Sequence, residues 1–443
     1  MGVIKKIATG AWLVLLVSCN NNPARKGTSS DLLINNLMAS DTAIRYKAIR
    51  FLEELEPGAD RQVAFMQAAA MDSFPPAEYE WQTIPSLLVE AATKKENPLL
   101  PQVISDVFPK LDAVSKTRAL AYLTTYPNKE SVTTFVRLFL KFHSEVTQFP
   151  AGGLSKSSKE INSIVFPSLL QLAGDEVHGA DIVLLLLENF ENDKLEPGSF
   201  ESYKDTLVTA STAIREQLAT ARKKITSIDK IWDDDSYLEL RRRSGIYEDI
   251  LGYFKGATVV AELTQYLSVE DANVKKFAAV SLLRLGQTVE KKYIDEIAAD
   301  PESRNYLYKT LVEFNKEKLF PPVYSTQAAF AEGVMVEWLL YPTELARKPD
   351  EIQLMKVVEV DEGPPDGLVE FYLYRFRSND STWKKDGWMT GVAGYFKKGV
   401  LSTEATGYTF SSFEKWESKT PEQHVADIRK LITESNKKNN KEN

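Results

Sequence analysis

Apolar residues recur every three to four positions through most of residues 31–320, and Pro, Gly or Asn separates the successive apolar segments. This is the period of an amphipathic helix, which brings the same face round about every 3.6 residues. Runs rich in β-branched residues are scarce in this stretch. The pattern therefore predicts a long series of amphipathic helices joined by short connections.

Two of these predicted helices carry the same pattern at the same spacing. Each starts with an aspartate that would cap the helix, because its carboxylate can accept hydrogen bonds from the first free N–H groups. The apolar positions that follow form one stripe, in which a small Ala lets a neighbouring helix approach closely. The matched residues are Asp41, Ile44, Arg45, Ala48, Ile49, Leu52 and Leu55 in one copy and Asp271, Val274, Lys275, Ala278, Ala279, Leu282 and Leu285 in the other; a fainter third copy has Lys116, Ala119, Leu120, Leu123 and Tyr126.

The order of Asp, β-branched, basic, Ala and Leu positions resembles the HEAT/armadillo class of helical repeats. The resemblance rests on two good copies and one weaker copy, spread over about 290 residues. It implies an α-solenoid, in which successive helix pairs stack and each contacts its neighbours. A non-repeating helical bundle with coincidentally similar helices is the alternative.

The pattern changes after Pro321-Pro322. Five short runs rich in β-branched and aromatic residues follow, most of them separated by Gly, Pro or Asn turns, and a helix capped by Thr420 is expected over 421–432. We expect residues 434–443 to be a disordered tail. The fold class predicted is mainly α, with a HEAT-like α-solenoid over 31–320 and a small C-terminal α+β antiparallel-sheet domain over 325–433. The predicted strands are 334–340, 352–360, 368–376, 388–396 and 405–413.

The first thirty residues read as an export signal and a linker. Lys5 and Lys6 precede an apolar run from Ile7 to Val17, which is too short to span a bilayer. The sequence Leu-Val-Ser-Cys that ends at Cys19 then resembles the lipobox of bacterial lipoproteins, which implies lipidation of Cys19. We therefore expect a signal peptide over 1–18 and a flexible tether over 19–30. A buried cysteine near an ordinary signal peptide is the alternative.

Composition and charge support an exported globular protein. Cys19 is the single cysteine in 443 residues, so no disulfide is expected. Removal of residues 1–18 takes away two lysines and no acids, which changes the net charge from −8 to −10. A net negative charge and export both argue against a nucleic-acid partner. We expect a lipid-anchored, extracytoplasmic protein of the bacterial cell envelope, whose N-terminal lipid attaches it to the membrane.

Motifs for catalysis or metal binding are missing from the sequence. It has no glycine-rich phosphate loop, no G-x-S-x-G and no H-E-x-x-H. His143, His178 and His424 fall in separate predicted segments and are expected at the surface or at helix ends, so neither a metal site nor a cofactor is expected. Three aspartates at 233–235 and three arginines at 241–243 are too far apart to pair along one helix. They are interpreted as helix-dipole charges, with a recognition patch as the alternative.

Aromatic residues gather near the C-terminus, where residues 368–416 contain twelve of them. In the run that starts at Phe371 they alternate onto both faces of the predicted strand. One face would pack on the C-terminal helix, and the other would be covered or would bind a ligand. A small sheet needs large side chains to fill its core, whereas the sharper interpretation is an aromatic platform. The candidate ligand-binding residues are Trp383, Trp388, Tyr395 and Tyr408.

Three functions follow, in order of preference. The first is a non-enzymatic envelope scaffold that binds a protein partner through its helical repeats. The second is a glycan- or peptidoglycan-binding lipoprotein that uses the C-terminal aromatics. The third is a carboxylate-dependent hydrolase, which would need a pair of acidic side chains facing a cleft.

Overall fold

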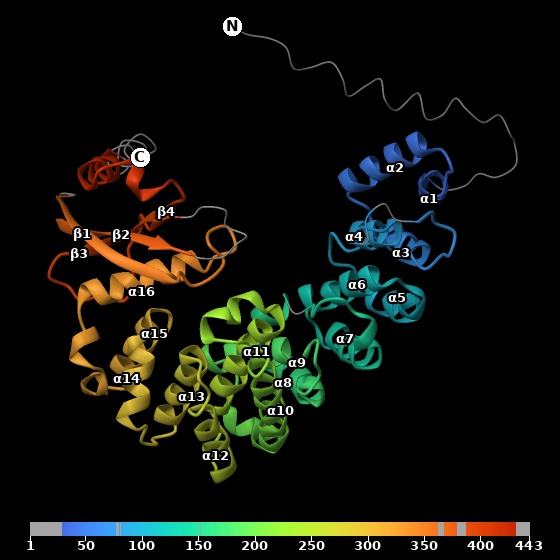
Figure 1. Cartoon of the computed structure of the whole chain (residues 1–443). Coiled ribbons are helices and arrows are strands. Elements are labelled where there is room, and N and C mark those ends of the chain that lie inside the picture. The colour runs from blue at the N-terminus through green and yellow to red at the C-terminus, as the bar shows by residue number, and fades with distance from the viewer. Residues whose placement is uncertain are drawn as a thin grey trace, which may run out of the picture. The chain divides into compact units, whose positions relative to one another are not determined.

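A computed structural model of the chain describes residues 29–76, 79, 81–150, 152–361, 367–378 and 387–430. The chain divides into two compact units, residues 1–157 and 158–443. Both are largely helical, and the second also contains a sheet (Figure 1). The predicted signal peptide, most of the tether and the C-terminal tail lie outside the described residues.

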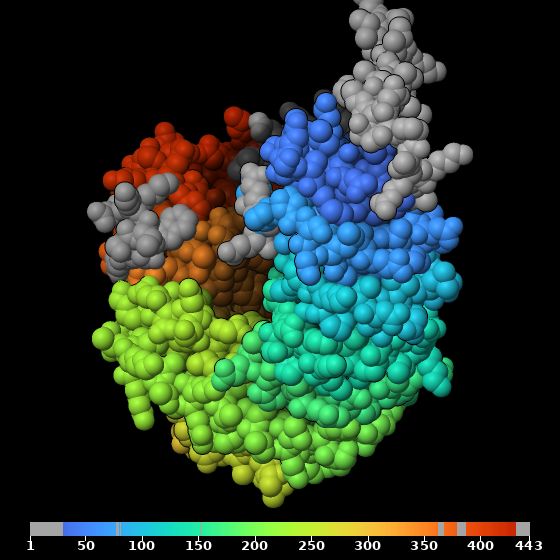
Figure 2. Space-filling view, turned by 90° about the vertical axis from the view of Figure 1, so that its right-hand side faces the viewer, coloured from blue at the N-terminus to red at the C-terminus, as the bar shows by residue number. Residues whose placement is uncertain are grey.

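Helices of the first unit stack in two layers. In one layer α1 contacts α3, α3 contacts α5 and α5 contacts α7, and in the other layer α2 contacts α4 and α4 contacts α6. In the space-filling view their side chains form a continuous packed surface, coloured blue to cyan (Figure 2). The helices are α1 (Ser29–Leu37), α2 (Thr42–Glu54), α3 (Ala59–Ala68), α4 (Ile84–Ala92), α5 (Leu100–Val107), α6 (Ala113–Thr125) and α7 (Lys129–Phe142).

The helices of the second unit have the same type of stacking among themselves. Helices α9, α11, α13, α15 and α16 contact one another in succession, and α10, α12 and α14 each pack against the helix that follows them. These are α8 (Lys159–Leu169), α9 (Gly179–Glu191), α10 (Lys204–Arg222), α11 (Asp235–Leu251), α12 (Ala257–Tyr266), α13 (Ala272–Arg284), α14 (Lys291–Ala299), α15 (Pro301–Glu313) and α16 (Gln327–Leu339). This neighbour-to-neighbour packing is solenoid-like, as predicted.

The repeated aspartates cap helices in all three copies. The Asp41 carboxylate accepts hydrogen bonds from the N–H groups of Ala43 and Ile44, and that of Asp271 accepts one from Asn273 N. The weaker third copy also has a cap that sequence reasoning missed. Asp112, seven residues before Ala119, accepts a hydrogen bond from Ser115 N at 2.7 Å. The spacing thus identifies true helix starts, because capping depends on local sequence.

A four-stranded antiparallel sheet follows the helices, with strand order β1-β2-β3-β4. Three predicted strands are confirmed within one or two residues. The fifth, predicted over 405–413, is much shorter, because Gly407 and Tyr408 have positive φ angles and break the extended chain. The strands are β1 (Glu351–Asp361), β2 (Leu368–Arg377), β3 (Met389–Lys397) and β4 (Phe410–Ser412).

The strand predicted over 334–340 is wrong, since these residues belong mostly to α16. This helix lies along one face of the sheet (Figure 1), where Ala331, Met335 and Leu339 pack with Tyr372 and Tyr374 of β2. Because α16 contacts α15 as well as the sheet, apolar residues occupy most of its circumference. A run that is apolar on all sides has neither the helix nor the strand period, and its type cannot be read from periodicity.

The other face of the sheet packs against the C-terminal helix, which is helical over residues 421–430. Phe371 and Leu373 of β2 form a buried cluster there with Trp416, Val425 and Ile428. The Thr420 hydroxyl accepts a hydrogen bond from Gln423 N, so the predicted cap is confirmed. Aromatics of β2 therefore alternate between two covered faces and form much of the core of the sheet region.

Candidate binding site

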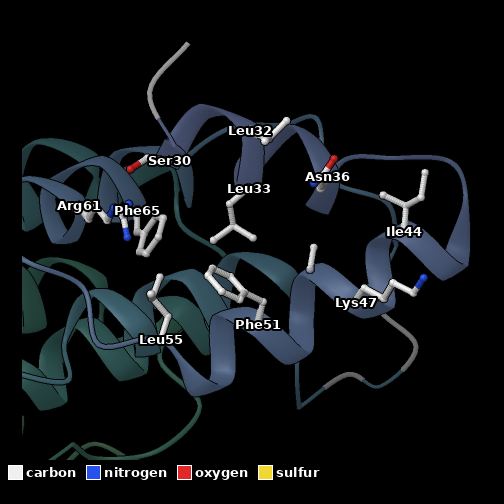
Figure 3. Close-up of a pocket in the computed structure, with 11 residues that line it drawn as sticks. Ser30, Leu32, Leu33, Asn36, Ile44, Lys47, Phe51, Leu55, Arg61 and Phe65 are labelled. Atoms are coloured by element: carbon white, nitrogen blue, oxygen red, sulfur yellow. The ribbon is translucent and has the colours of Figure 1, made fainter. Parts of the chain in front are cut away.

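An apolar cavity of about 290 Å³ lies between α1, α2 and the start of α3. Leu33 of α1 and Phe51 of α2 point toward one another in it, and Phe65 of α3 lies at its inner end (Figure 3). Lys47 and Arg61 also line the cavity, so two cationic side chains border a mostly apolar surface.

Several apolar side chains beside this cavity are exposed. Helix α2 packs mainly against α1 and α4. Ile44 is 45% exposed, Phe51 49% and Leu32 of α1 53%. Contiguous exposed apolar side chains of this kind mark interaction sites more often than single exposed ones do. The arrangement suits the apolar face of a helix, whose anchors recur every three to four residues.

A second exposed apolar feature of the first unit is an aromatic pair in the connection between α3 and α4. The rings of Tyr79 and Trp81 stack with their centroids 5.3 Å apart, and Trp81 is 65% exposed. Sequence reasoning missed both this pair and the cavity. Helix α2 did carry a signal, because Phe51 widens its apolar stripe seven residues after Ile44, and Tyr46 adds an apolar ring outside that stripe.

The residues predicted to bind ligand are only partly described. Trp383 lies outside the described residues, and so does Cys19, the predicted lipidation site. Trp388, Tyr395 and Tyr408 are half-buried and pack against the same cluster on the C-terminal-helix face of the sheet. The structure therefore places the three described candidates on one face, at the margin of a core.

Each of the three rings has close neighbours. The guanidinium carbons of Arg375 and Arg377 lie 4.3 and 5.1 Å from the centroid of Trp388. Cations at these distances interact favourably with an indole ring and occupy space that a sugar ring would need. Tyr395 and Tyr408 lie 5.9 Å apart, and each is within 6.3 Å of the buried Phe371.

The three histidines lie in three separate parts of the fold. His143 is at the end of α7, and His178 takes the N-cap position of α9 but is buried. His424 is also buried, in the first turn of the helix at 421–430, and its ring stacks on Trp416 at 4.3 Å. No group of three or more His, Cys, Asp or Glu side chains in the described part of the chain could hold a metal ion.

The arginine run at 241–243 lies in the middle of α11 and is neither a dipole-matching last turn nor an exposed patch. Arg241 is buried and donates to both carboxylate oxygens of Asp271 and both of Glu302, with its shortest contacts at 2.7 Å. Burial alone would raise the pKa of Asp271, but the Arg241 charge and the hydrogen bonds outweigh it and lower that pKa. The network therefore ties α11 to α13 and α15.

The remaining arginines of the run differ from Arg241 and from each other. Arg242 is exposed and pairs with Glu239 and Asp181. Arg243 is buried and lines a separate cavity of about 630 Å³ between α10, α11 and the connection from α8 to α9. The three neighbouring arginines thus have three different environments, which their spacing along the helix could not reveal.

None of the described helices is both long and apolar enough to cross a membrane. No protein-family model, curated protein or solved structure matches this chain, so its function must be inferred from the geometry of these surfaces.

Proposed function

We propose that this protein is a non-enzymatic, lipid-anchored scaffold of the bacterial cell envelope that binds a partner protein through its helical-repeat surface. The observation that carries the proposal is the cavity between α1, α2 and α3, with its exposed Leu32, Ile44 and Phe51. Solenoids commonly act as protein-binding scaffolds, and this class-level expectation supports the proposal without fixing the partner.

The occupant we propose is an amphipathic helix of the partner. Apolar side chains at i, i+3 or i+4 and i+7 would enter between Leu33 and Phe51, as in other helix-in-groove complexes. Lys47 borders the cavity, so an acidic residue flanking the apolar face would be electrostatically favoured. The partner segment is therefore apolar on one face and acidic at its edge.

Selection from a random peptide-display library with the full chain as bait tests this proposal. We expect the enriched peptides to share apolar residues at helical spacing and at least one Asp or Glu. The double variant Ile44→Ser/Phe51→Ser should weaken their binding by at least about tenfold. As a matched control, Val312→Ser changes an exposed apolar residue on a helix of the other unit and should leave the affinity unchanged.

Two results would count against the groove. Enriched peptides without helical apolar spacing would exclude the proposed occupant. Peptides that bind the Ile44→Ser/Phe51→Ser variant as tightly as the unchanged chain would place the binding surface elsewhere.

The anchor is a separate part of the proposal, and it rests on the sequence of residues 1–19. Acyl chains contribute about 0.8 kcal/mol per buried CH₂, so several chains on one cysteine hold a protein firmly at a membrane. Membrane fractionation of Cys19→Ala should therefore find the protein soluble or as an uncleaved precursor. Unchanged, carbonate-resistant attachment of that variant would contradict lipidation at Cys19.

A glycan-binding role is the second candidate, and one cavity favours it. About 420 Å³ of space between the β3–β4 edge and the helix at 421–430 is lined by Phe410, Ser411 and Ser412 and by the charged Lys419 and Asp427. Sugars suit sites that combine an aromatic surface with a few polar groups. Calorimetric titration of the full chain with cell-wall fragments tests this, and heat that survives in Phe410→Ala would exclude this site.

A further inference from the structure

The cavity beside Arg243 has chemistry unlike that of the groove on α1–α3. It measures about 630 Å³, within the usual range of small-molecule sites, and lies wholly in the second unit. Arg243 of α11 is its single basic lining residue. Polar and acidic groups on the other walls are Gln171 and Glu176 from the connection between α8 and α9, and Asp205, Thr206 and Gln217 from α10.

Arg243 is buried, and no described residue pairs with its charge. Arg243 is 8% exposed, and its Nε atom is buried with no hydrogen-bond partner. No ion pair joins it to any residue of the described ranges, although Glu176 and Asp205 line the same cavity. By contrast, Arg241 and Arg242 of the same helix each pair with two carboxylates.

An unpaired guanidinium at this depth is unfavourable for the folded protein by itself. Arginine does not deprotonate in proteins, so it cannot escape the penalty by losing its charge. Removing such an ion from water is unfavourable unless an anion and hydrogen bonds compensate it. A side chain that is costly to the fold and faces a cavity is expected where a ligand supplies the missing anion.

Carboxylates fit the Arg243 side of the cavity. The planar guanidinium can pair with a carboxylate or a phosphate through two parallel hydrogen bonds. The acidic Glu176 and Asp205 distinguish between these two ligands, because they would repel the higher charge of a phosphate and attract a cation. A ligand with one carboxylate and one ammonium group satisfies both sides of the cavity. Gln171, Gln217 and Thr206 supply neutral donors and acceptors for the groups between.

We propose that this cavity binds a zwitterionic ligand, a free amino acid or a short peptide, whose carboxylate pairs with Arg243 and whose ammonium group lies near Glu176 and Asp205. The site is independent of the groove on α1–α3. Binding there would give the scaffold a small-molecule ligand in addition to its partner.

Isothermal titration calorimetry of the full chain tests this inference. The probes are the common amino acids, a set of dipeptides, acetate, inorganic phosphate and ethylammonium. We expect at least one amino acid or dipeptide to bind with a Kd below about 1 mM, and each single-charge probe and phosphate to bind at least about tenfold more weakly. Comparing the affinities of free amino acids with those of dipeptides shows which of the two zwitterionic ligands the cavity prefers.

Variants then locate the bound groups. Arg243→Gln should weaken binding of the selected zwitterion at least about tenfold, whereas Arg242→Gln, its exposed neighbour, should leave the affinity unchanged. Asp205→Asn changes an exposed residue. It should weaken the binding of the zwitterion and strengthen the binding of acetate. This second variant still decides the question if Arg243→Gln fails to fold.

Stability without ligand separates a binding role from a structural one. Because Arg243 pairs with no described residue, Arg243→Gln should melt at the same temperature as the unchanged chain or higher when no ligand is present. A large loss of thermal stability in that variant would show that Arg243 supports the fold and would overturn the proposal. So would the absence of binding by every zwitterion, phosphate binding more tightly than any zwitterion, or equal affinity in Asp205→Asn.

Discussion

Helices α2 and α13 carry the same sequence pattern and yet have different surroundings. Both begin with a capping aspartate and continue with a β-branched residue and Ala and Leu at the same offsets. Val274 of α13 is fully buried, whereas its counterpart Ile44 of α2 is 45% exposed. Ten residues after the aspartate, α13 has the buried Ser281 and α2 has the exposed Phe51.

Neighbouring helices cause this difference. Helix α13 contacts α11 and α15 in its own layer and α12 and α14 beside it, and α2 packs against α1 and α4. A helix with neighbours on both sides buries its whole apolar stripe. A helix with fewer neighbours leaves part of the stripe accessible. The same motif can therefore serve the core at one place and present a binding surface at another.

The largest expected effect that separates the two copies comes from the capping aspartates. Asp271→Ala removes a helix cap and also leaves Arg241 with one of its two buried partners, so we expect a loss of about 3–5 kcal/mol in the free energy of unfolding. Asp41→Ala removes only an exposed cap, which contributes about 1 kcal/mol. Urea denaturation of the full chain, followed by circular dichroism, measures both.

The third copy provides an intermediate case for this comparison. Asp112 caps α6 and also accepts a hydrogen bond from the Thr83 hydroxyl at 2.6 Å, so Asp112→Ala should fall between the other two variants. Equal losses for Asp41→Ala and Asp271→Ala would mean that the buried network adds no stability beyond the cap.

A smaller effect, which depends on pH, is expected from Glu248 of α11. This residue is fully buried, and burial holds the pKa of its carboxyl well above the ordinary value, with the Asp249 and Asp271 charges adding to the shift. The unfolded chain loses this proton as the pH rises through about 4.5, whereas the folded chain keeps it up to its higher pKa. Stability must then decrease with rising pH over that interval.

Glu248→Gln removes this titration. The stability of the variant relative to the unchanged chain should therefore increase between pH 5 and pH 8, as measured by urea denaturation at several pH values. Asp271 has the opposite effect on the pH dependence of stability. Because folding lowers its pKa, its carboxylate stabilises the folded chain above about pH 3.8, and this stabilisation is lost in acid. A constant difference between Glu248→Gln and the unchanged chain across that range would show that Glu248 is ionised in the folded state.

Local sequence predicted local structure well. The caps at Asp41, Asp271 and Thr420 depend on residues two or three positions away, and local sequence was enough to identify them. The partners of Arg241 are 30 and 61 residues distant, so no reading of α11 by itself could find that network. The helical nature of 334–340 was hidden for a related reason, because contacts with α15 and the sheet make its pattern apolar on most sides.

The candidate sites were also difficult to predict, because they depend on contacts between distant parts of the chain. Aromatic enrichment near the C-terminus drew attention to Trp388, Tyr395 and Tyr408, but the enrichment arises largely because a small sheet with two covered faces needs large core side chains. The accessible apolar side chains of α2 depend on which helices pack against it. That is a property of the stack, and a single repeat does not encode it.

The smallest expected effect on stability comes from the exposed side of α2. Phe51→Ser should change the free energy of unfolding by no more than about 0.5 kcal/mol, because half of this ring is already in water. Its buried neighbour Leu52, which is 1% exposed, is the matched control, and Leu52→Ala should lose about 2–5 kcal/mol. If Phe51→Ser were as destabilising as Leu52→Ala, Phe51 would belong to the core of the first unit, and its exposure could not be attributed to a binding role. A near-zero change together with lost peptide binding is what an interaction surface requires, since its residues contribute to the complex and little to the fold.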